Sequence, residues 1–326
     1  MPKVSVIIPV YGVEKYIERC ARSLFEQTLD DIEYIFVNDC TKDRSIEILK
    51  EVLLQYPKRQ PQTKIVSMPI NSGLPTVRKY GIQLATGDYL IHCDSDDWIE
   101  HDTYEKMYLK AIEDDYDMVF CNFNYSDGIH HRKVKHKFKN MSREHILMVL
   151  VQECLWSVCG TLVKKNVFVN NKIFYPIENM FEDLILMIQM LHYTSKYTYV
   201  EDSLYYYYHN PNSITQSIQK DSIINRLNQA CCNTDIAIDM INKYRFKSSL
   251  DIILILKLYC RAILSPLTSN EEILKMWYST YPDIDKENII FNRNIPVNLK
   301  INYFSVKIGV YSFLKKIQKY LRIILS

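Results

Sequence analysis

The chain has 326 residues, of which 48% are hydrophobic and 24% are charged, and its formal net charge is +2. This composition is typical of a folded globular protein with one large core and an appendage, and it excludes a disordered chain. Because the charge is close to balance, there is no global electrostatic reason to expect a nucleic acid partner.

Nine cysteines are scattered along the chain, an odd number without a CxxC pair. This pattern argues against a disulfide framework and against a zinc site, so we expect buried thiols in a reducing cytoplasm. The N-terminus runs directly into a strand pattern, so we expect no secretory signal. No window offers the ~20 uncharged apolar residues that a spanning helix needs. The best one, residues 251–264, is interrupted by Lys257 and Arg261 and is expected to be a buried helix.

The first hundred residues alternate β-branched runs with amphipathic stretches. This pattern predicts strands joined by crossover helices in a largely parallel sheet. We expect strands at 4–10, 32–38, 64–68 and 89–93, with helices around 17–25, 45–55 and 75–85. The first strand is apolar on both faces, as a central parallel strand should be.

Beyond residue 100 the pattern is mixed. Helices are predicted around 102–114, 142–152 and 181–194, and strands at 117–124, 156–163 and 197–208. A basic, histidine-containing stretch at 130–139 is expected to be a hairpin or a loop, and helical pattern dominates from residue 221. Turn formers cluster at 210–219, so we expect one domain over 1–215, divided near residue 100, and a helical region over 216–326.

Polar or turn-forming residues follow the predicted strands at the point where each strand ends. They are Pro9 and Tyr11 at the first strand, Asn38 and Asp39 at the second, Asn71 and Gly73 at the third, and Asp94 and Asp96 at the fourth. Doubly wound sheets bind ligands beyond the carboxyl ends of their strands. The four strand ends therefore predict a single pocket.

The densest charge cluster is Asp94, Asp96 and Asp97, directly after an apolar strand. Carboxylates this close raise one another's pKa and cost stability unless a divalent cation or a ligand compensates. An isolated DxD string is more often a solvated turn that caps a helix, but the companion strand ends favour a site here. For Asp97 a helix cap and a functional role are weighed equally.

Together these motifs resemble the inverting family 2 glycosyltransferases of GT-A fold. The resemblance covers about the first two hundred residues, in the family's order and spacing. It rests on Val6-Ile-Ile-Pro-Val-Tyr11, Val37 to Asp43, Asn71-Ser-Gly73 with Arg78, Gly87-Asp-Tyr89 and Asp94-Ser-Asp-Asp97. It implies an α/β fold with a Rossmann-like, mostly parallel sheet flanked by helices and a helical C-terminal appendage. Residues 1–215 would be the catalytic domain, with a nucleotide-binding half over 1–100 and an acceptor half over 101–215.

The resemblance also implies the reaction and the cofactor. We expect a metal-dependent inverting transfer from a nucleotide-diphosphate sugar, expected to be a UDP-sugar, to a hydroxyl of a glycan or lipid-linked acceptor in surface polysaccharide biosynthesis. Mg²⁺ or Mn²⁺ would be held by Asp96 and Asp94. Donor contacts are expected from Pro9, Tyr11, Asp39, Asn71, Arg78, Asp94 and Ser95, with Asp39 accepting a hydrogen bond from the pyrimidine.

The dipeptide Glu182-Asp183, at the start of an apolar helix, matches the place where the family carries its general base. By resemblance Asp183 is the base and Glu182 a neighbour that touches acceptor or donor sugar. Acidic residues at a helix N-terminus also stabilise the helix without any chemistry, and this reading stays open.

Three departures from the family pattern are Cys40 at a glycine position, Lys79 for the usual asparagine and His209 for the usual arginine. They give some support to an alternative function, a non-catalytic, membrane-associated scaffold that retains the fold. A nucleotidyltransferase is the weaker rival, because only one glycine follows the first strand. The basic stretch at 130–139 is expected to be a solvated face or an acceptor-facing loop.

At the C-terminus, residues 306–325 place apolar side chains on one helical stripe and four cations on the other side, namely Lys315, Lys316, Lys319 and Arg322. A basic amphipathic helix of this kind lies in the headgroup region of an anionic membrane; the alternative is a helix packed on the catalytic domain. We expect a cytoplasmic protein, peripheral on the inner face of a bacterial plasma membrane if the tail binds lipid.

Overall fold

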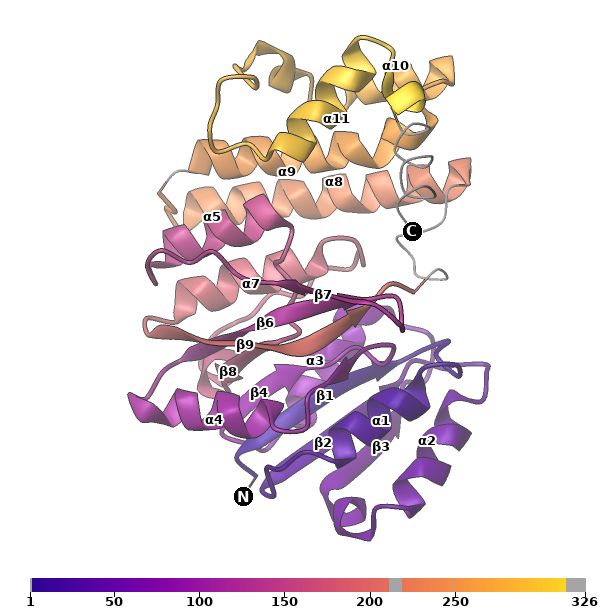
Figure 1. Cartoon of the computed structure of the whole chain (residues 1–326), viewed down its shortest axis with the longest axis vertical. Helices are drawn as coiled ribbons and strands as arrows, with labels where there is room; N and C mark the ends of the chain where they lie inside the picture. Colours follow the sequence, from indigo (N-terminus) through magenta and orange to yellow (C-terminus); the bar gives the residue numbers. More distant parts are fainter. Residues whose placement is uncertain (1, 211–218, 248, 315–326) are drawn as a thin grey trace. The chain divides into compact units, whose positions relative to one another are not determined.

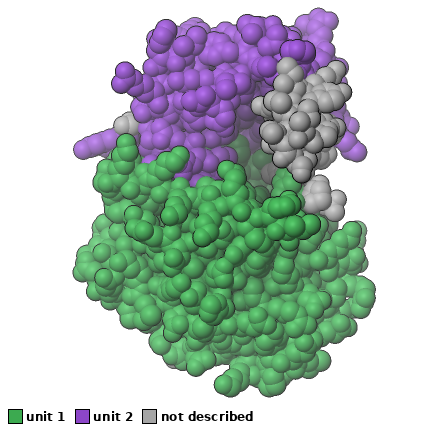
Figure 2. Space-filling view, viewed as in Figure 1, with its two compact units in different colours: residues 1–146, 156–211 green, residues 147–155, 212–326 purple. Residues whose placement is uncertain are grey.

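The computed structural model describes residues 2–210, 219–247 and 249–314. The chain separates into two compact units, coloured separately in Figure 2. The first contains residues 1–146 and 156–211, and the second contains residues 147–155 and 212–326. The first unit carries the sheet and the second is helical.

Within the described residues, the first unit is built on a nine-stranded sheet with the order β3-β2-β1-β4-β8-β6-β9-β5, and β7 pairs with β6 (Figure 1). Its N-terminal half is parallel and consists of β1 (Val4–Val10), β2 (Ile32–Asn38), β3 (Thr63–Ser67) and β4 (Tyr89–His92). The other strands are β5 (Trp98–Ile99), β6 (Met118–Ser126), β7 (His131–Val134), β8 (Thr161–Lys164) and β9 (Tyr197–Tyr208). β6 and β9 are parallel, whereas β8 is antiparallel to β4 and β6.

Helices cover both faces of the parallel half. They are α1 (Ile17–Phe25), α2 (Ser45–Leu54), α3 (Leu74–Leu84) and α4 (Thr103–Glu113), with a short 3₁₀ helix η1 (Pro57–Gln62). Successive residues of a strand point to opposite faces. Val6 and Ile8 accordingly join the apolar cluster of α1, α2 and α4, and Ile7 joins the cluster of α3. This explains why the parallel strands are apolar on both sides.

The predicted α/β fold class is confirmed, and the strands at 4–10, 32–38 and 197–208 have the predicted bounds. The strand predicted at 156–163 is wrong at its start, because β8 begins only at Thr161. Gly160 turns the chain there with φ +73°, a conformation that favours glycine. The two-residue strand β5 was not predicted, since two residues carry no alternation.

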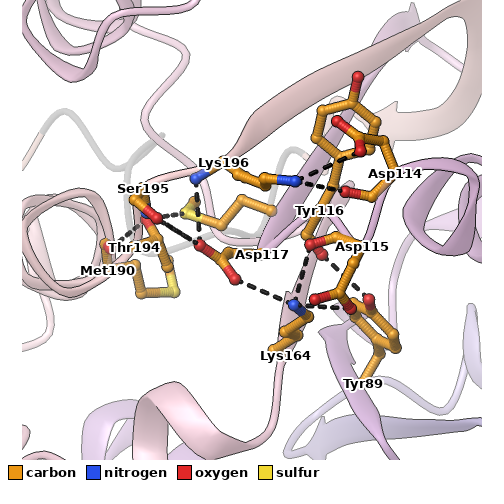
Figure 3. A network of polar contacts seen from close by, with 11 residues as sticks. Tyr89, Asp114, Asp115, Tyr116, Asp117, Lys164, Met190, Thr194, Ser195 and Lys196 are labelled. Atoms are coloured by element: carbon orange, nitrogen blue, oxygen red, sulfur yellow. Dashed lines mark hydrogen bonds and ion pairs between the residues drawn. The ribbon is translucent and has the colours of Figure 1, made fainter.

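A charged network at the amino ends of β6 and β9 holds the sheet together, as Figure 3 shows. Lys164 Nζ lies 2.9 Å from Asp115 Oδ1 and 3.1 Å from Asp117 Oδ1. The other Asp117 oxygen accepts the backbone N–H groups of Ser195 (2.9 Å) and Lys196 (3.0 Å). Burial alone would raise the pKa of Asp117, but these hydrogen bonds and Lys164 lower it below its ordinary value. The network lies at the opposite edge from the predicted pocket, so its role is structural.

The pairing of β6 with β9 is interrupted by a bulge. Cys121 pairs with Val200, whereas Phe123 pairs with Tyr205, so β9 advances by five residues while β6 advances by two. The side chain of Asn122 donates a hydrogen bond of 2.7 Å to a carbonyl within the bulge. Bulges of this kind re-aim the side chains that follow them.

The first unit also contains α6 (Asn166–Val169) and α7 (Glu182–Tyr193), and α5 (Arg143–Glu153) runs from the first unit into the second. The second unit contains α8 (Lys220–Lys243), α9 (Ser249–Leu264), α10 (Glu271–Ser279) and α11 (Val297–Lys307), with the 3₁₀ helices η2 (Ser265–Leu267) and η3 (Pro282–Lys286). The buried Arg261 is its polar centre. The Arg261 guanidinium pairs with both carboxylate oxygens of Asp285 (3.0 and 3.1 Å) and lies over the Trp277 ring.

The membrane predictions concern the second unit. Among the described residues, no helix combines the length and hydropathy that crossing a bilayer requires. The continuous helix predicted from residue 306 is wrong at its start, because α11 ends at Lys307 and Gly309 follows with φ +74°. Residues 315–325 of the predicted tail, with its four cations, lie outside the described residues.

Candidate functional site

The carboxyl ends of β1, β2 and β4 meet at one edge of the sheet, because β1 pairs in parallel with both neighbours. This edge brings together Tyr11 after β1, Asp39 after β2 and Asp94 after β4. Pro9 lies within β1 and is partly exposed, and the Tyr11 side chain is exposed. The predicted strand-end residues are therefore neighbours at one edge.

Asp39 is buried and organises the loop that leads into α3. Its Oδ1 accepts the N–H of Ser72 (2.7 Å) and its Oδ2 accepts that of Gly73 (3.0 Å). The side chain of Asn71 donates to the Asp39 carbonyl (3.2 Å). A carboxylate has about four acceptor sites, so each Asp39 oxygen retains capacity for a further donor. Asn71 thus lies beside Asp39, as the strand ends predicted.

Cys40, at the family's glycine position, adopts φ +57°. This is the left-handed conformation that glycine adopts without penalty and that costs other residues about 1 kcal/mol or more. Cys40 therefore adopts the conformation that a glycine at this position would adopt without strain. Asp43 Oδ1 accepts the N–H of Ser45, the first residue of α2 (3.1 Å).

The three carboxylates after β4 have different surroundings. The Asp97 N–H donates to the Asp94 carbonyl (3.1 Å), which closes a tight turn. The Asp97 side chain is buried, where it accepts the Tyr205 hydroxyl (2.6 Å) and the Tyr208 N–H (2.7 Å). Of the two readings of Asp97, the helix cap is wrong, because β5 rather than a helix follows Asp97 and the partners of its side chain lie on β9. Asp97 anchors β9 to the turn.

Asp94 and Asp96 remain as candidate metal ligands, with Ser95 buried between them. Asp96 Oδ2 accepts the Asn210 side chain (3.0 Å). Burial, and then the charge of Asp94, raise the pKa of Asp96, an electrostatic cost that a cation would relieve. The described residues contain no group of three or more histidine, cysteine and acidic side chains suited to a metal. Mg²⁺ usually takes only one or two carboxylates plus phosphates, so the pair fits a hard divalent cation that arrives with a diphosphate.

Arg78 joins the two halves of the site. Its side chain is only 1% exposed, and its Nε donates to Glu182 Oε1 (2.8 Å). Its Nη2 lies 3.1 Å from Asp94 Oδ1 and 3.4 Å from Asp183 Oδ1. Because the Arg78 side chain is buried, it does not form a surface ion pair. The guanidinium instead links the turn after β4 to the start of α7.

Glu182 and Asp183 begin α7, after Phe181 turns the chain with φ +64°. Burial, and then the charge of Asp183, raise the pKa of Glu182 well above its ordinary value. Burial acts in the same direction on Asp183, but the charge of Arg78 and a hydrogen bond with Glu182 lower its pKa. Asp183 is also the more accessible of the two, with 20% of its side chain exposed against 2%. The ionised, accessible carboxylate is therefore the one predicted as the base.

Three side chains at the site were missed by the sequence reasoning. Tyr205 accepts the Asp94 N–H (3.1 Å) besides donating to Asp97, and Asn210 donates to Asp96. Asn179 accepts the N–H of Leu74 at the start of α3 (3.0 Å). For Tyr205 the sequence offers a signal, the four consecutive tyrosines at the end of β9. The two asparagines lie singly in loops and follow no pattern.

Comparison with known proteins identifies the family. Residues 5–174, more than half of the chain, match the model of glycosyl transferase family 2. The uncharacterized glycosyltransferase EpsJ of Bacillus subtilis (strain 168) is 30% identical over 224 residues, which cover 66% of this chain and 64% of that protein. A poly(ribitol-phosphate) beta-glucosyltransferase of Bacillus spizizenii (strain W23) is 31% identical over 212 residues, covering 63% of this chain and 32% of that protein. The match therefore spans less than two thirds of these relatives.

Solved structures agree on the fold. S. aureus TarS 1–349, crystallised in complex with UDP-GlcNAc, superimposes with a TM-score of 0.66 at 17% identity over 98% of this chain and 91% of that chain. At this identity the likeness shows the fold alone, and it confirms the GT-A fold. From its motifs, its sheet and the family model together, the chain belongs to glycosyl transferase family 2.

Proposed function

We propose that this protein is a metal-dependent inverting glycosyltransferase that uses a UDP-sugar and transfers the sugar to a hydroxyl of a glycan or lipid-linked acceptor in surface polysaccharide biosynthesis. The observation that carries the proposal is the cluster in which Arg78 holds Asp94, Glu182 and Asp183 together at the carboxyl edge of the sheet. The UDP-GlcNAc bound by TarS supports the donor class. The name of the Bacillus spizizenii relative supports a surface polymer as acceptor.

The donor would lie along the strand ends. The nucleoside would contact Pro9, Tyr11, Asn71 and Asp39, and the diphosphate would lie at Asp94 and Asp96 with Ser95 between them. Mg²⁺ or Mn²⁺, when bound there, would neutralise the charge of the departing diphosphate. Arg78 would position Asp94 through their ion pair. Its guanidinium is buried, so it would not be an exposed phosphate ligand.

Asp183 would take the proton of the acceptor hydroxyl as the oxygen attacks the anomeric carbon, which is general-base catalysis. A single displacement of this kind inverts the anomeric configuration. The rigid helix α7 and the buried guanidinium hold Asp183 in place, and such support is what a catalytic group requires. Glu182 has the role of holding Arg78.

The experiment is a screen of UDP-sugars for Mn²⁺-dependent UDP release by the full chain, with and without candidate glycan acceptors. Loss of the base or of a metal ligand is expected to lower turnover about 10²–10⁴-fold, so Asp183→Asn and Asp96→Asn should lose activity. Asp88→Asn is the matched control, because Asp88 is exposed at the other end of β4. Activity in the Asp183 and Asp96 variants equal to the control would contradict the assignment. A wild-type chain that turns over no donor would favour the scaffold alternative.

We further propose that residues 1–215 form the catalytic domain and that residues 306–325 attach the protein to the cytoplasmic face of the membrane. The sequence supports the membrane attachment, because residues 288–326 contain seven lysines and arginines and no acidic residue. Flotation with vesicles containing anionic lipid, compared between the full chain and a chain ending at residue 305, tests it. Equal flotation of both would exclude attachment through the tail.

A further inference from the structure

The strand order leaves a defined side of the sheet for the acceptor. Residues expected to hold the nucleoside follow β1 and β2, the carboxylates follow β4, and β8, β6 and β9 come next across the sheet. If the proposed function is correct, a donor with its diphosphate at β4 and its nucleoside over β1 and β2 does not occupy the carboxyl ends of β6 and β9. An acceptor that approaches over these ends would not compete with the donor.

Two tyrosines lie side by side there. Tyr125 of β6 and Tyr207 of β9 pair directly across the sheet, and their ring centroids are 5.3 Å apart in an edge-to-face arrangement. Tyr205 points to the same face and is buried against Asp97, whereas Tyr207 is 38% exposed. After burial, the charge of Asp97 is the largest influence that raises the pKa of Tyr207, which is consistent with a ring close to the carboxylates. An exposed aromatic ring beside a glycosyl-transfer site suits the C–H face of a sugar ring.

Arg132 lies next to this pair of rings. Arg132 of β7 pairs with Tyr125, and its guanidinium lies 5.3 Å from the centroid of the Tyr125 ring. Arg132, Lys133 and Lys135 are exposed, and within the described part of the chain none of them lies within 4.0 Å of a carboxylate oxygen. The acidic residue nearest in the chain, Asp127, is held in the hairpin turn by backbone N–H groups.

We propose that Tyr207, Tyr125 and Arg132 form an acceptor subsite for a glycan that carries phosphate. The sugar ring of the acceptor stacks on Tyr207, and the neighbouring phosphate pairs with the Arg132 guanidinium, whose planar fork matches phosphate oxygens. The pleat turns Lys133, which pairs with Asn124, to the opposite face, so the phosphate contact is assigned to Arg132. The phosphate belongs either to a phosphodiester chain or to the diphosphate that joins a sugar to a lipid carrier.

The test is direct binding to the full chain in the presence of UDP and Mn²⁺, measured by titration calorimetry. One probe is a tetramer of N-acetylglucosamine 1-phosphate, and a second is N-acetylglucosaminyl diphosphate with a short citronellyl chain. The neutral probe is chitotetraose. The variants are Arg132→Gln, Tyr207→Ala and Tyr207→Phe, with Lys58→Gln as the control, because Lys58 is an exposed cation in η1.

We expect at least one phosphorylated probe to bind about tenfold more tightly than chitotetraose, since one charge-assisted contact is worth about this factor. Arg132→Gln should remove that preference, and Tyr207→Ala should weaken binding of the same probe about tenfold while Tyr207→Phe retains it. UDP affinity should be unchanged in all four variants. The probe that shows the effect identifies the source of the phosphate.

Equal binding of chitotetraose and both phosphorylated probes, or an Arg132→Gln variant indistinguishable from Lys58→Gln, would overturn the subsite. So would a wild-type chain that binds neither phosphorylated probe, or equal affinities of Tyr207→Ala and wild type. UDP binding separates the two proposals. A chain that binds UDP but shows none of these losses leaves glycosyl transfer standing, whereas a chain that binds no UDP lacks the donor site itself.

Discussion

Replacing Arg78 by methionine tests whether the buried guanidinium holds the site together. The substitution keeps an unbranched side chain of comparable length but leaves Glu182 and Asp183 without a cation in a buried environment. Removing one partner of a buried ion pair typically costs about 3–5 kcal/mol. Glu182, whose pKa burial already raises, will take up a proton and relieve part of this cost. We therefore expect a loss of about 3 kcal/mol at neutral pH.

Urea unfolding, followed by circular dichroism and by tryptophan fluorescence, measures the loss. With a denaturant slope of about 2–3 kcal/mol per molar, 3 kcal/mol lowers the midpoint of the first unit's transition by about 1–1.5 M. Arg22→Met is the matched control, because the Arg22 pair with Glu18 is exposed. Such a pair contributes about 0.5 kcal/mol or less.

The double variant Arg78→Met with Glu182→Gln completes a thermodynamic cycle. Because the two side chains are in contact, we expect a coupling free energy above about 1 kcal/mol. A loss below about 1 kcal/mol for Arg78→Met, or strict additivity in the cycle, would refute the view that the guanidinium stabilises these carboxylates.

Three further outcomes follow from other contacts. Asp97→Ala should lose about 2–4 kcal/mol of unfolding free energy, because two buried hydrogen bonds lose their acceptor, whereas Asp97→Asn should lose about 1 kcal/mol; equal losses in urea titrations would show that these bonds do not anchor β9. The pKa of Asp117 is lower in the folded chain than in the unfolded chain. Its ionised carboxylate therefore stabilises the fold above about pH 4, and this stabilisation is lost as the pH falls through the pKa of the folded state. Asp117→Asn should therefore cost about 2 kcal/mol at pH 7 and progressively less as the pH falls below about 4, and a pH-independent cost would contradict the assignment. Gly87→Ala should cost about 1–3 kcal/mol by thermal unfolding, because its Cβ would lie 2.8 Å from the backbone nitrogen of Ser5, and an unchanged melting temperature would show that the strands can move apart.

The grouping of polar residues at the carboxyl ends of the parallel strands could be predicted from the sequence, because each strand is recognisable from its own apolar run. Tyr11, Asp39 and Asp94 each follow an apolar run of their own, and parallel pairing then brings them together. The contacts within the site were not predictable in this way. Arg78 meets Glu182 across 104 positions of the chain, and no periodicity links them.

Asp97 illustrates the same limit. An acidic residue after a strand is compatible with a helix cap, a metal ligand or a tertiary anchor, and the three readings share one local pattern. Its partner Tyr208 lies 111 positions away, at the end of a strand whose register depends on an irregularity. The role of Asp97 is decided by its tertiary contacts with β9 and not by the helix or strand propensity of the residues around it.

The bulge in β9 has a consequence for how this protein can change over evolutionary time. Side chains alternate between the two faces of a strand, so an odd number of added or lost residues exchanges the faces. The three surplus residues of β9 therefore decide that Tyr205 and Tyr207, and not Tyr206 and Tyr208, share the face of Phe123 and Tyr125. A single-residue deletion between Val200 and Tyr205 would present the other pair to the carboxylates without altering one tyrosine. Small insertions and deletions at this point offer a route to a new acceptor surface that point substitutions do not.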